Sequence, residues 1–474
     1  MKPFLHIVRK RSVQPLLFAV VIGLLATGCR TYEQQNHVIQ YWHQGNLTNA
    51  VAEASKTADQ NAKNKDAIIW RLEQGAVLRA NGQYDASNKA FDQAQEKMDD
   101  YAQKAKVRLG QETGALLSNQ ANLDYEGRAY DGIMLNTYEA LNYLALGEPD
   151  KARVELIRAY QRQQDAVQDN QKRIEKVQAE AAKNKDSAAI QKAQNDPKLQ
   201  AQIQDTATNL NDLKPYAAYV NPFTVYLDGL FFMTDAADGS DLERAHKSFE
   251  RVTDFAPNNS YVKQDLAMVD GLLNGQPLAA TTFVIFETGC APQRGQIRID
   301  IPIIVTKVSY IGAAFPTLKP QGDYISSLTV TADGKTMTTL LVSDMDSVIG
   351  LDFKNEMPIV ITKTIAATVV KGVAAYVANQ AAGQQNEWAG LVMQIGTAIY
   401  QAAVNIADER TWTTLPKEFQ ACHFPTPPDR KIELETPGGG QRIPVTIEDG
   451  TINIVYVKSI NATSPLLVTQ IKLK

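Results

Sequence analysis

The chain has 474 residues, of which 44% are hydrophobic and 21% charged, and its formal net charge is −4 at pH 7. This length is sufficient for two or three domains with cores of their own, and the composition is that of a globular protein. Beyond its first eleven residues the chain has no marked cluster of basic residues, which argues against a nucleic-acid-binding protein, because such proteins neutralise phosphates with Lys and Arg.

Residues 1–28 have the pattern of an export signal. Four basic residues lie within the first eleven positions, and an apolar run of 12 residues follows at Pro15–Ala26. Such a run is too short to span a bilayer as a stable helix and is typical of a secretory signal. Its removal takes away four positive charges and no negative ones, which leaves a net charge of −8 and does not favour binding to anionic lipid surfaces.

The apolar run ends in Leu24-Leu25-Ala26-Thr27-Gly28-Cys29. Small residues before a cysteine resemble the lipobox of bacterial lipoproteins, which implies cleavage before Cys29 and acylation, for example with palmitate, of its thiol and its new amino group. Several acyl chains anchor a protein firmly, because each buried CH₂ contributes about 0.8 kcal/mol. The alternative is an ordinary secreted protein with an incidental cysteine. Arg30, where inner-membrane lipoproteins of enterobacteria carry Asp, favours the outer membrane by the same resemblance.

The first half of the mature chain is organised around the segment Ile133–Gln163, which predicts two helices joined at Gly147. Small and large residues alternate in it at spacings of three to five, as in tetratricopeptide-like (TPR-like) repeats. The same register recurs in His37–Thr57, Ile69–Ala94 and Tyr226–Pro257. A single unit of this kind cannot bury its own apolar face. We therefore predict a TPR-like helical domain at 29–277.

The first helices of these pairs are expected to line a groove, and the residues at its surface are apolar. They are Leu72, Ala76, Leu141, Leu144, Tyr226, Leu230 and Met233. We predict that the groove holds an apolar helix, either from the chain itself or from a partner. Residues 161–215 are rich in Gln, Lys, Asp and Glu with a narrow apolar seam, which predicts a projecting helical hairpin broken at Asp196-Pro197. This hairpin is either a solvated extension or an arm that docks a partner.

After residue 277 the pattern becomes that of short strands. Expected strands are Thr281–Phe286, Gln296–Val305, Ser326–Thr331, Lys335–Val342, Lys431–Glu435, Arg442–Glu448, Thr451–Lys458 and Leu466–Leu473. Asp333-Gly334 and Asp449-Gly450 predict tight turns between strands. We predict a β-rich domain at 278–474 with an antiparallel sheet or sandwich, and for the whole chain an α+β multidomain fold.

A helical hairpin rich in Ala and Gly is expected at 359–407, inserted between the two groups of strands. Its second arm, Trp388–Ala407, has no charged residue over 20 positions, which approaches the length that spans a bilayer. Gln394, Gln401 and Asn405 interrupt this arm, and small residues along both arms permit close helix–helix contact. The hairpin packs against the protein's own sheet, contacts a membrane, or forms an oligomer interface.

The sequence contains no recognisable catalytic or metal-binding motif, so we expect neither an enzyme nor a cofactor, although paired carboxylates without a motif stay open. Two cysteines remain after Cys29, Cys290 and Cys422, and they form either a disulfide in an oxidising compartment or two separate buried thiols. A zinc site at Cys422-His423 with Cys290 would lack an evident fourth ligand.

The hairpin is followed by Asp408-Glu409-Arg410-Thr411-Trp412-Thr413-Thr414-Leu415-Pro416. We expect Trp412 and Leu415 to anchor the hairpin onto the sheet, Pro416 to turn the chain, and Arg410 to pair with a carboxylate at this junction. This D-x-R-x-W-x-x-L-P element, together with Asn142–Gly147 and Glu287–Pro292, resembles an uncharacterised family of bacterial lipoproteins with TPR-like N-terminal halves.

The resemblance covers nearly the whole mature chain. It implies an envelope location, and it suggests a link to peptidoglycan synthesis, but it carries no established activity. We therefore expect a lipid-anchored periplasmic scaffold that binds envelope proteins. The alternative is a lipoprotein that inserts into membrane or assembles a pore through the 359–407 hairpin.

Overall fold

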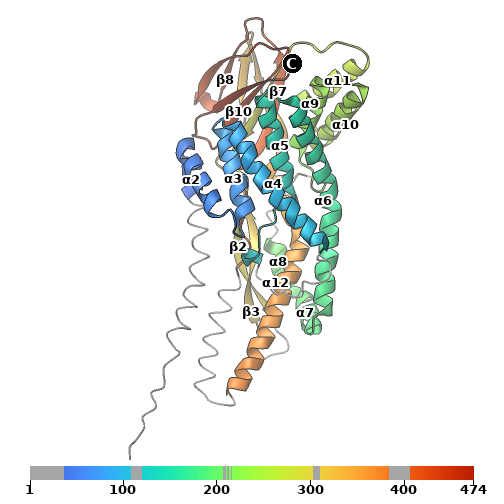
Figure 1. Cartoon of the computed structure of the whole chain (residues 1–474), viewed down its shortest axis with the longest axis vertical. Helices are drawn as coiled ribbons and strands as arrows, with labels where there is room; N and C mark the ends of the chain where they lie inside the picture. The colour runs from blue at the N-terminus through green and yellow to red at the C-terminus, as the bar shows by residue number, and fades with distance from the viewer. Residues whose placement is uncertain are drawn as a thin grey trace, which may run out of the picture.

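The computed structural model describes residues 37–107, 120–206, 210, 213–214, 216–302, 310–383 and 406–474. It has a mixed α+β fold, in which helices come first and strands follow (Figure 1). The predicted signal peptide with Cys29, and the second arm of the predicted hairpin apart from its last two residues, lie outside the described residues.

Helices make up the described part of the chain before residue 274. After a helical stretch at residues 37–43 come α2 (Leu47–Gln60), α3 (Ala67–Ala80), α4 (Tyr84–Val107), α5 (Ala129–Ala145), α6 (Pro149–Lys183), α7 (Ser187–Gln194), α8 (Pro197–Thr206), α9 (Pro222–Thr234), α10 (Gly239–Phe255) and α11 (Ser260–Leu273). The predicted helix pairs are present, since each of the four expected segments contains two helices joined by a turn.

Three of these turns share one hydrogen-bond pattern. Gly45, Gly82 and Gly147 each adopt a positive φ, between 66° and 73°, just after a helix. The N–H group that follows each glycine donates to a carbonyl one turn back in the preceding helix, that of Tyr41, Leu78 or Tyr143. This is the Schellman arrangement, which requires a left-handed residue and so favours glycine. The local sequence therefore fixes where each first helix ends.

Within the pairs, a glycine on the first helix meets an aromatic ring on the second. A Cβ atom placed on Gly75 would lie 2.3 Å from the ring of Phe91, and one on Gly229 would lie 3.1 Å from that of Phe249. These two contacts occupy corresponding positions in the register predicted from the sequence. The glycines permit each helix to approach the ring of its neighbour closely.

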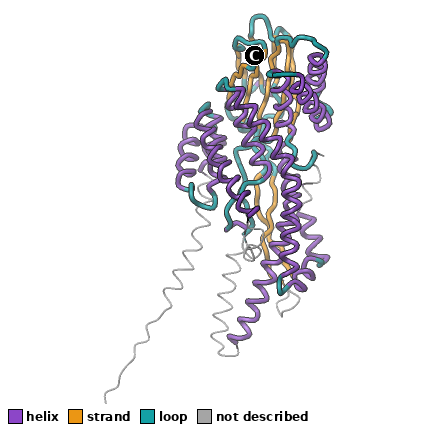
Figure 2. Tube along the Cα trace, turned by 45° about the vertical axis from the view of Figure 1, so that its right-hand side comes forward, coloured by secondary structure: helices purple, strands orange, loops and turns teal. Residues whose placement is uncertain are grey.

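The strands form three sheets. They are β1 (Thr281–Thr288), β2 (Gln293–Pro302), β3 (Tyr310–Lys319), β4 (Thr329–Ala332), β5 (Lys335–Thr338), β6 (Leu340–Asp344), β7 (Glu418–Pro425), β8 (Lys431–Glu435), β9 (Arg442–Thr446), β10 (Ile452–Ser459) and β11 (Leu467–Lys472). A five-stranded sheet has the order β11-β10-β1-β7-β6, a four-stranded sheet has the order β5-β4-β8-β9, and β2 pairs with β3 alone. In Figure 2 the strands run along the length of the molecule.

The prediction of a purely antiparallel sheet is wrong at one pair. Strand β1 lies parallel to β10, with Thr281 opposite Ile452 and Glu287 opposite Lys458. The two strands are about 170 residues apart in the sequence, so no turn signal relates them. Strands β3 and β7 were not expected from the sequence.

The five-stranded sheet is buried on both faces. On one face Phe283, Ile285 and Tyr456 belong to a core shared with the helices. On the other face Val284, Phe286 and Val457 belong to a core shared with the four-stranded sheet. Because side chains of a strand alternate between faces, each strand supplies both cores. The helix core joins residues from Val38 to Ile471, so the helices and the sheet pack as one body.

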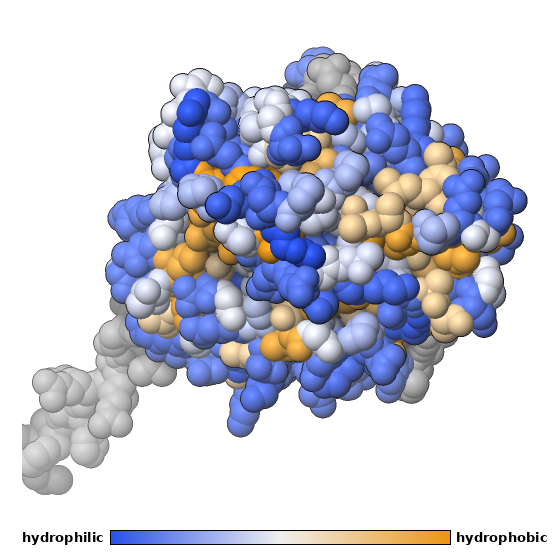
Figure 3. Space-filling model, turned by 90° about the horizontal axis from the view of Figure 1, so that it is seen from above, coloured by the Kyte–Doolittle hydropathy of each residue, from blue (hydrophilic) through white to orange (hydrophobic). Residues whose placement is uncertain are grey.

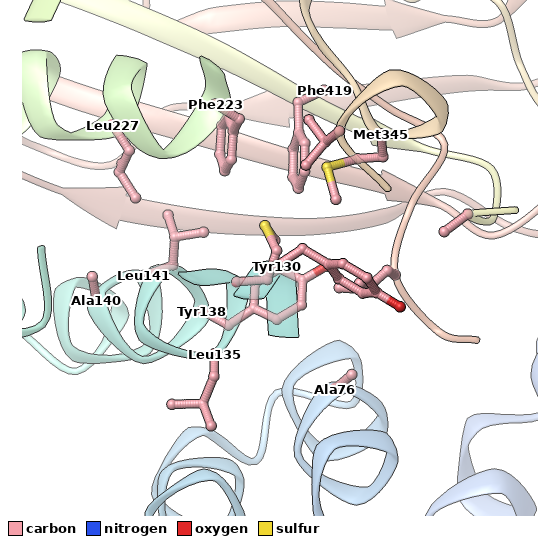
Figure 4. Packing of buried hydrophobic residues seen from close by; sticks show 14 of the residues in the cluster. Ala76, Tyr130, Leu135, Tyr138, Ala140, Leu141, Phe223, Leu227, Met345 and Phe419 are labelled. Carbon is pink, nitrogen blue, oxygen red and sulfur yellow. The ribbon is translucent and has the colours of Figure 1, made fainter. Parts of the chain in front are cut away.

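A close view of this core shows helix α5 between α3 and α9 (Figure 4). The rings of Phe223 on α9 and Phe419 on β7 are stacked, with centroids 3.7 Å apart and planes within 1°. Leu141 and Tyr138 of α5 lie in the same core. This face of the sheet is thus covered by helices from the first half of the chain.

A second, smaller core lies farther along the molecule, where α6 extends beyond its helix pair. It joins Val177 of α6 and Ile190 of α7 to the β2–β3 ribbon and to α12 (Met345–Gly383), through residues such as Phe315 and Ile365. The predicted hairpin at 161–215 therefore does not project freely. Its first arm, helix α6, ends at Lys183, earlier than the break that the sequence predicts, and the Asp196-Pro197 step instead separates α7 from α8.

Helix α12 is the first arm of the predicted hairpin, and it begins earlier than expected. Its segment Met345–Ala374 is the one helix among the described residues that is long and apolar enough to cross a membrane, and half of its most apolar stretch is buried within the protein. Figure 1 shows α12 in orange, continuing past α7 at the lower end of the molecule.

Candidate functional site

The segment Asp408–Pro416 lies between the helices and the five-stranded sheet. Trp412 is fully buried, and its ring packs edge-to-face against Phe91 of α4 and Tyr138 of α5, with centroids 5.8 and 5.9 Å away. The indole N–H donates to the hydroxyl of Thr414 at 3.0 Å. Trp412 and Leu415 are buried anchors, as expected, but Trp412 fastens the segment to the helices of the first half.

The two threonines that follow Trp412 bind a buried glutamate. The carboxylate of Glu73, on α3, accepts hydrogen bonds from the backbone N–H and the hydroxyl of both Thr413 and Thr414, at 2.6 to 3.3 Å. Burial raises the pKa of Glu73, and the four donors offset part of that increase. The contact joins residues 340 positions apart and holds the two halves of the chain together.

Arg410 pairs with carboxylates, as expected. Its guanidinium lies 2.7 Å from Asp408 and 3.0 Å from Asp66, the residue before α3. Burial would raise the pKa of Asp408, but Arg410 outweighs it, with help from Arg128, and the pKa is lowered. Asp408 therefore stays ionised inside the protein.

Arg128, at the start of α5, connects this segment to α12. Its guanidinium lies 3.5 Å from Glu356 and 3.7 Å from Asp408, and it donates to the backbone carbonyl of Arg410 at 2.6 Å. Glu356 also accepts from Arg294 of β2 at 2.6 Å. Burial alone would raise the pKa of Glu356, but Arg294 and Arg128 outweigh it and lower the pKa to about 2.

The pairings of Arg128 tie both ends of the segment 357–407, because Glu356 precedes it and Asp408 follows it. A neighbouring acid, Asp352, has its pKa raised to about 7 by burial and by the charge of Glu356. We name this group of Arg128, Arg294, Glu356, Asp408 and Arg410 the arginine cluster.

A second buried charged group lies between α3, α5 and the sheet. Glu287 of β1 accepts hydrogen bonds from Tyr138, Tyr456 and Lys458. The guanidinium of Arg79 lies 5.2 Å from the centre of the Tyr138 ring and 4.9 Å from that of Tyr456. Burial would raise the pKa of Glu287, but Lys458 and Arg79 outweigh it, so the pKa is lowered. The cavity beside these residues measures about 20 Å³, which is room for one water molecule.

All seven residues of the predicted groove are buried and belong to the helix core. Leu72, Ala76, Leu141, Leu144, Tyr226, Leu230 and Met233 are at most 5% exposed. The groove residues share this core with strands β1, β7 and β10, with the segment around Trp412 and with the apolar helix α12, so the chain itself covers them with strands as well as with a helix. A sheet satisfies the apolar surface as well as a helix does, since burial depends on area and not on the type of element.

The disulfide alternative for Cys290 and Cys422 is also wrong, because both thiols are free and buried. Cys422 lies opposite Val284 and faces the core between the sheets, whereas Cys290 follows β1 and faces the helix core. Strand β1 continues for four residues beyond Val284, about 13 Å, before Gly289 and Cys290, and the two thiols belong to the cores on opposite faces of the sheet, so a disulfide cannot join them. Within the described ranges, no group of three or more His, Cys, Asp or Glu side chains is arranged to hold a metal ion.

Sequence reasoning did not identify Glu73, Arg128 or Glu287 as important residues. A signal existed for Glu287, which stands at an inward position of the otherwise uncharged strand Thr281–Thr288. A charge at such a position needs a buried partner. For Glu73 and Arg128 the sequence around each residue gives no comparable indication.

Comparisons with protein-family models, with curated proteins and with solved structures found no match for this chain.

Proposed function

We propose that this chain is an outer-membrane lipoprotein, anchored through Cys29, that acts in the periplasm as a TPR-like scaffold for cell-envelope proteins and is linked to peptidoglycan synthesis. The proposal has no enzymatic step. The observation that carries it is that the described charged clusters and the apolar groove make their contacts within the chain. They stiffen a single body, and partners bind its outer surface.

The TPR-like description is supported by the three equivalent glycine turns and by the two glycine–phenylalanine contacts in one register. In a scaffold of this kind the groove is occupied by the chain's own sheet, so the exposed sides of the helix pairs offer the binding surface. Seen from above, the molecule is mostly hydrophilic, with small apolar patches among the polar side chains (Figure 3). Such a surface suits reversible contacts between folded proteins.

The anchor and the scaffold are tested separately. For the anchor, Cys29→Ser should move the protein from the outer-membrane fraction to the soluble periplasmic fraction. Recovery of the variant with the outer membrane in equal amount would contradict the lipid anchor. For the scaffold, affinity purification from crosslinked envelopes should recover the same partner proteins in replicate preparations, and the absence of any reproducible partner would contradict it.

A second candidate function is membrane insertion through the 359–407 segment. The observation that favours it is the apolar stretch Met345–Ala374 of α12, together with the 59% exposure of Val377 farther along the same helix. Flotation of Cys29→Ser protein with liposomes separates the two functions. The scaffold predicts no flotation without the acyl chains, and insertion predicts that the protein floats.

A further inference from the structure

A hollow of about 590 Å³ lies beside the core between the two sheets, where three loops meet. The loops are 324–326 before β4, 436–441 between β8 and β9, and 462–465 between β10 and β11. We propose that this hollow binds an uncharged carbohydrate chain built from N-acetylated sugars. Its volume is in the range of small-molecule sites and holds roughly one or two sugar rings.

The chemistry of the lining selects a neutral ligand. None of the residues that line the hollow is charged. Two charges of opposite sign lie just behind the lining: the carboxylate of Asp323 accepts from the N–H of Ala462 at 3.1 Å, and the ammonium of Lys417, which pairs with Asp346, lies 5.3 Å from the centre of the Tyr324 ring. The lining itself therefore favours neither an anion nor a cation. It combines the ring of Tyr324 and the flat faces of Pro437 and Pro465 with the polar side chains of Ser326 and Thr463. Sugars present apolar C–H faces and polar edges, which match an aromatic surface bordered by hydroxyl and amide groups.

The walls of the hollow are held rigidly by side-chain amides. Asn461 accepts hydrogen bonds from the backbone N–H groups of Thr463 and Ser464 at 2.9 and 2.8 Å, and donates to the carbonyl of His43 at 2.6 Å. Gln441 donates to the carbonyl of Ser464 at 2.9 Å and accepts from the N–H of Leu466 at 3.1 Å. Walls fixed in this way lose little freedom when a ligand binds.

Tyr324 is positioned by Gly289. This glycine has a φ of 71°, and a Cβ atom on it would lie 2.6 Å from the Cβ of Tyr324. The tyrosine therefore lies directly on the backbone of the Glu287–Pro292 segment. Close by, the hydroxyl of Ser326 is exposed and has no hydrogen-bond partner among the described residues, so it is available to a ligand.

A peptide ligand is less favoured, because an extended peptide usually adds to an open strand edge. The edge strand next to the hollow, β9, contains Pro444, which has no N–H to donate. At its end the carbonyl of Thr446 accepts from the side chain of Gln470 on β11 at 2.9 Å. The amide of Gln441 closes the other end of the gap between β9 and β11.

The uncharged lining of the hollow is a feature of the structure. The choice of N-acetylated sugars rests on the proposed function, because peptidoglycan is the abundant carbohydrate polymer of the envelope. The test is isothermal titration of the full acylated chain in detergent with the tetramer of β-1,4-linked N-acetylglucosamine. Maltotetraose and a neutral tetrapeptide are titrated in parallel.

Ser326→Trp fills the hollow at an exposed position, and Thr338→Trp adds the same side chain at an exposed position of β5, outside the lining. We expect the wild type and Thr338→Trp to bind the tetramer equally, and Ser326→Trp to bind it at least about tenfold more weakly, since each tenfold is about 1.4 kcal/mol. Ser326→Ala, which keeps the hollow open, should weaken binding only a few-fold.

Absence of tetramer binding to the wild type would overturn the proposal, as would equal binding by Ser326→Trp and Thr338→Trp. Tighter binding of the tetrapeptide than of the tetramer would overturn the carbohydrate assignment, and equal binding of maltotetraose would overturn the assignment to N-acetylated sugars. None of these results alters the fractionation of Cys29→Ser, so failure of this site and failure of the anchor are distinguishable.

Discussion

Two buried regions of this molecule each contain a glutamate, and the pKa of the carboxyl group is shifted in opposite directions in the two. Between the helices and the sheet, Glu287 has Lys458 and Arg79 beside it, and its pKa is lowered. Between α4, α5 and α6, Glu139 lies beside a second acid, Glu155, and burial together with that neighbouring charge raises its pKa to about 9. The first region stabilises the ionised carboxylate of Glu287, whereas the second disfavours the ionised carboxylate of Glu139. Burial raises the pKa of both glutamates, and neighbouring cations reverse this shift only at Glu287.

The contacts around Glu139 and Glu155 explain why the pKa of Glu139 is raised. The amide of Asn136 donates to Glu139 at 3.3 Å and to Glu155 at 2.8 Å, so one donor serves two acids. Arg158 pairs with Glu155 at 2.7 Å but is almost half exposed. Its charge is therefore partly screened by solvent, and among the described residues no cation pairs with Glu139.

The largest expected effect on stability comes from removing the carboxylate of Glu287. Glu287→Ala leaves Lys458 and Arg79 buried without their carboxylate, which should lower the free energy of unfolding by about 3–5 kcal/mol. Urea unfolding of the full-length protein, followed by circular dichroism, measures it. The double variant Glu287→Leu with Lys458→Met removes both charges and should recover most of the loss. A double variant as unstable as Glu287→Ala would show that the ion pair is not the cause.

An intermediate loss of stability is expected at Glu73, a buried glutamate that accepts from hydroxyl and backbone donors and pairs with no cation in the part of the chain that the structure describes. Glu73→Ala removes the acceptor of four hydrogen bonds from Thr413 and Thr414, which should lower the free energy of unfolding by about 2–4 kcal/mol. Glu73→Gln keeps one carbonyl oxygen and should lose roughly half as much. Equal losses in the two variants would indicate that packing, not hydrogen bonding, holds the segment.

The smallest expected effect is an increase in the free energy of unfolding, and it depends on pH. Glu139 keeps its proton in the folded state up to a pKa of about 9, whereas the unfolded chain releases it near the ordinary value of 4.5. The contribution of Glu139 to the free energy of unfolding is therefore fully present below pH 4.5 and is lost as the pH rises toward 9. Glu139→Gln carries no titrating group and should be more stable than the wild type by about 1–2 kcal/mol at pH 8.

The control for this prediction is the same pair of proteins at pH 4, where the two should have nearly equal free energies of unfolding. Thermal unfolding across pH 4 to 9 measures the difference. A difference between variant and wild type that stays constant over this range would contradict the role assigned to Glu139.

Features encoded locally could be predicted from the sequence. The glycines at positions 45, 82 and 147 mark helix ends because the turn they make depends only on neighbouring residues. Strand β8 was expected at its observed bounds, and Asp333-Gly334 joins β4 to β5 as expected. The break before α8 follows from the effect of Pro197 on its neighbour.

Features that depend on distant residues could not be predicted. Strand β7 is buried on both faces, so its sequence lacks the alternation that identifies a half-buried strand. Strand β3 contains Gly312 and Pro316, which read as turn residues. The groove is covered by segments far from it in the sequence, and the contact between Glu73 and Thr413 joins positions that no local pattern relates.

The position of β10 determines when the molecule is able to fold. This strand lies between β1 and β11, and it comes from residues 452–459. Until those residues have been synthesised, one side of β1 has no partner and the apolar surfaces of the helices have no complete sheet to cover. Contacts between such distant residues form slowly. The core that the helices share with the sheet is therefore completed only when nearly all of the chain has been synthesised, and until then its exposed apolar surfaces favour aggregation.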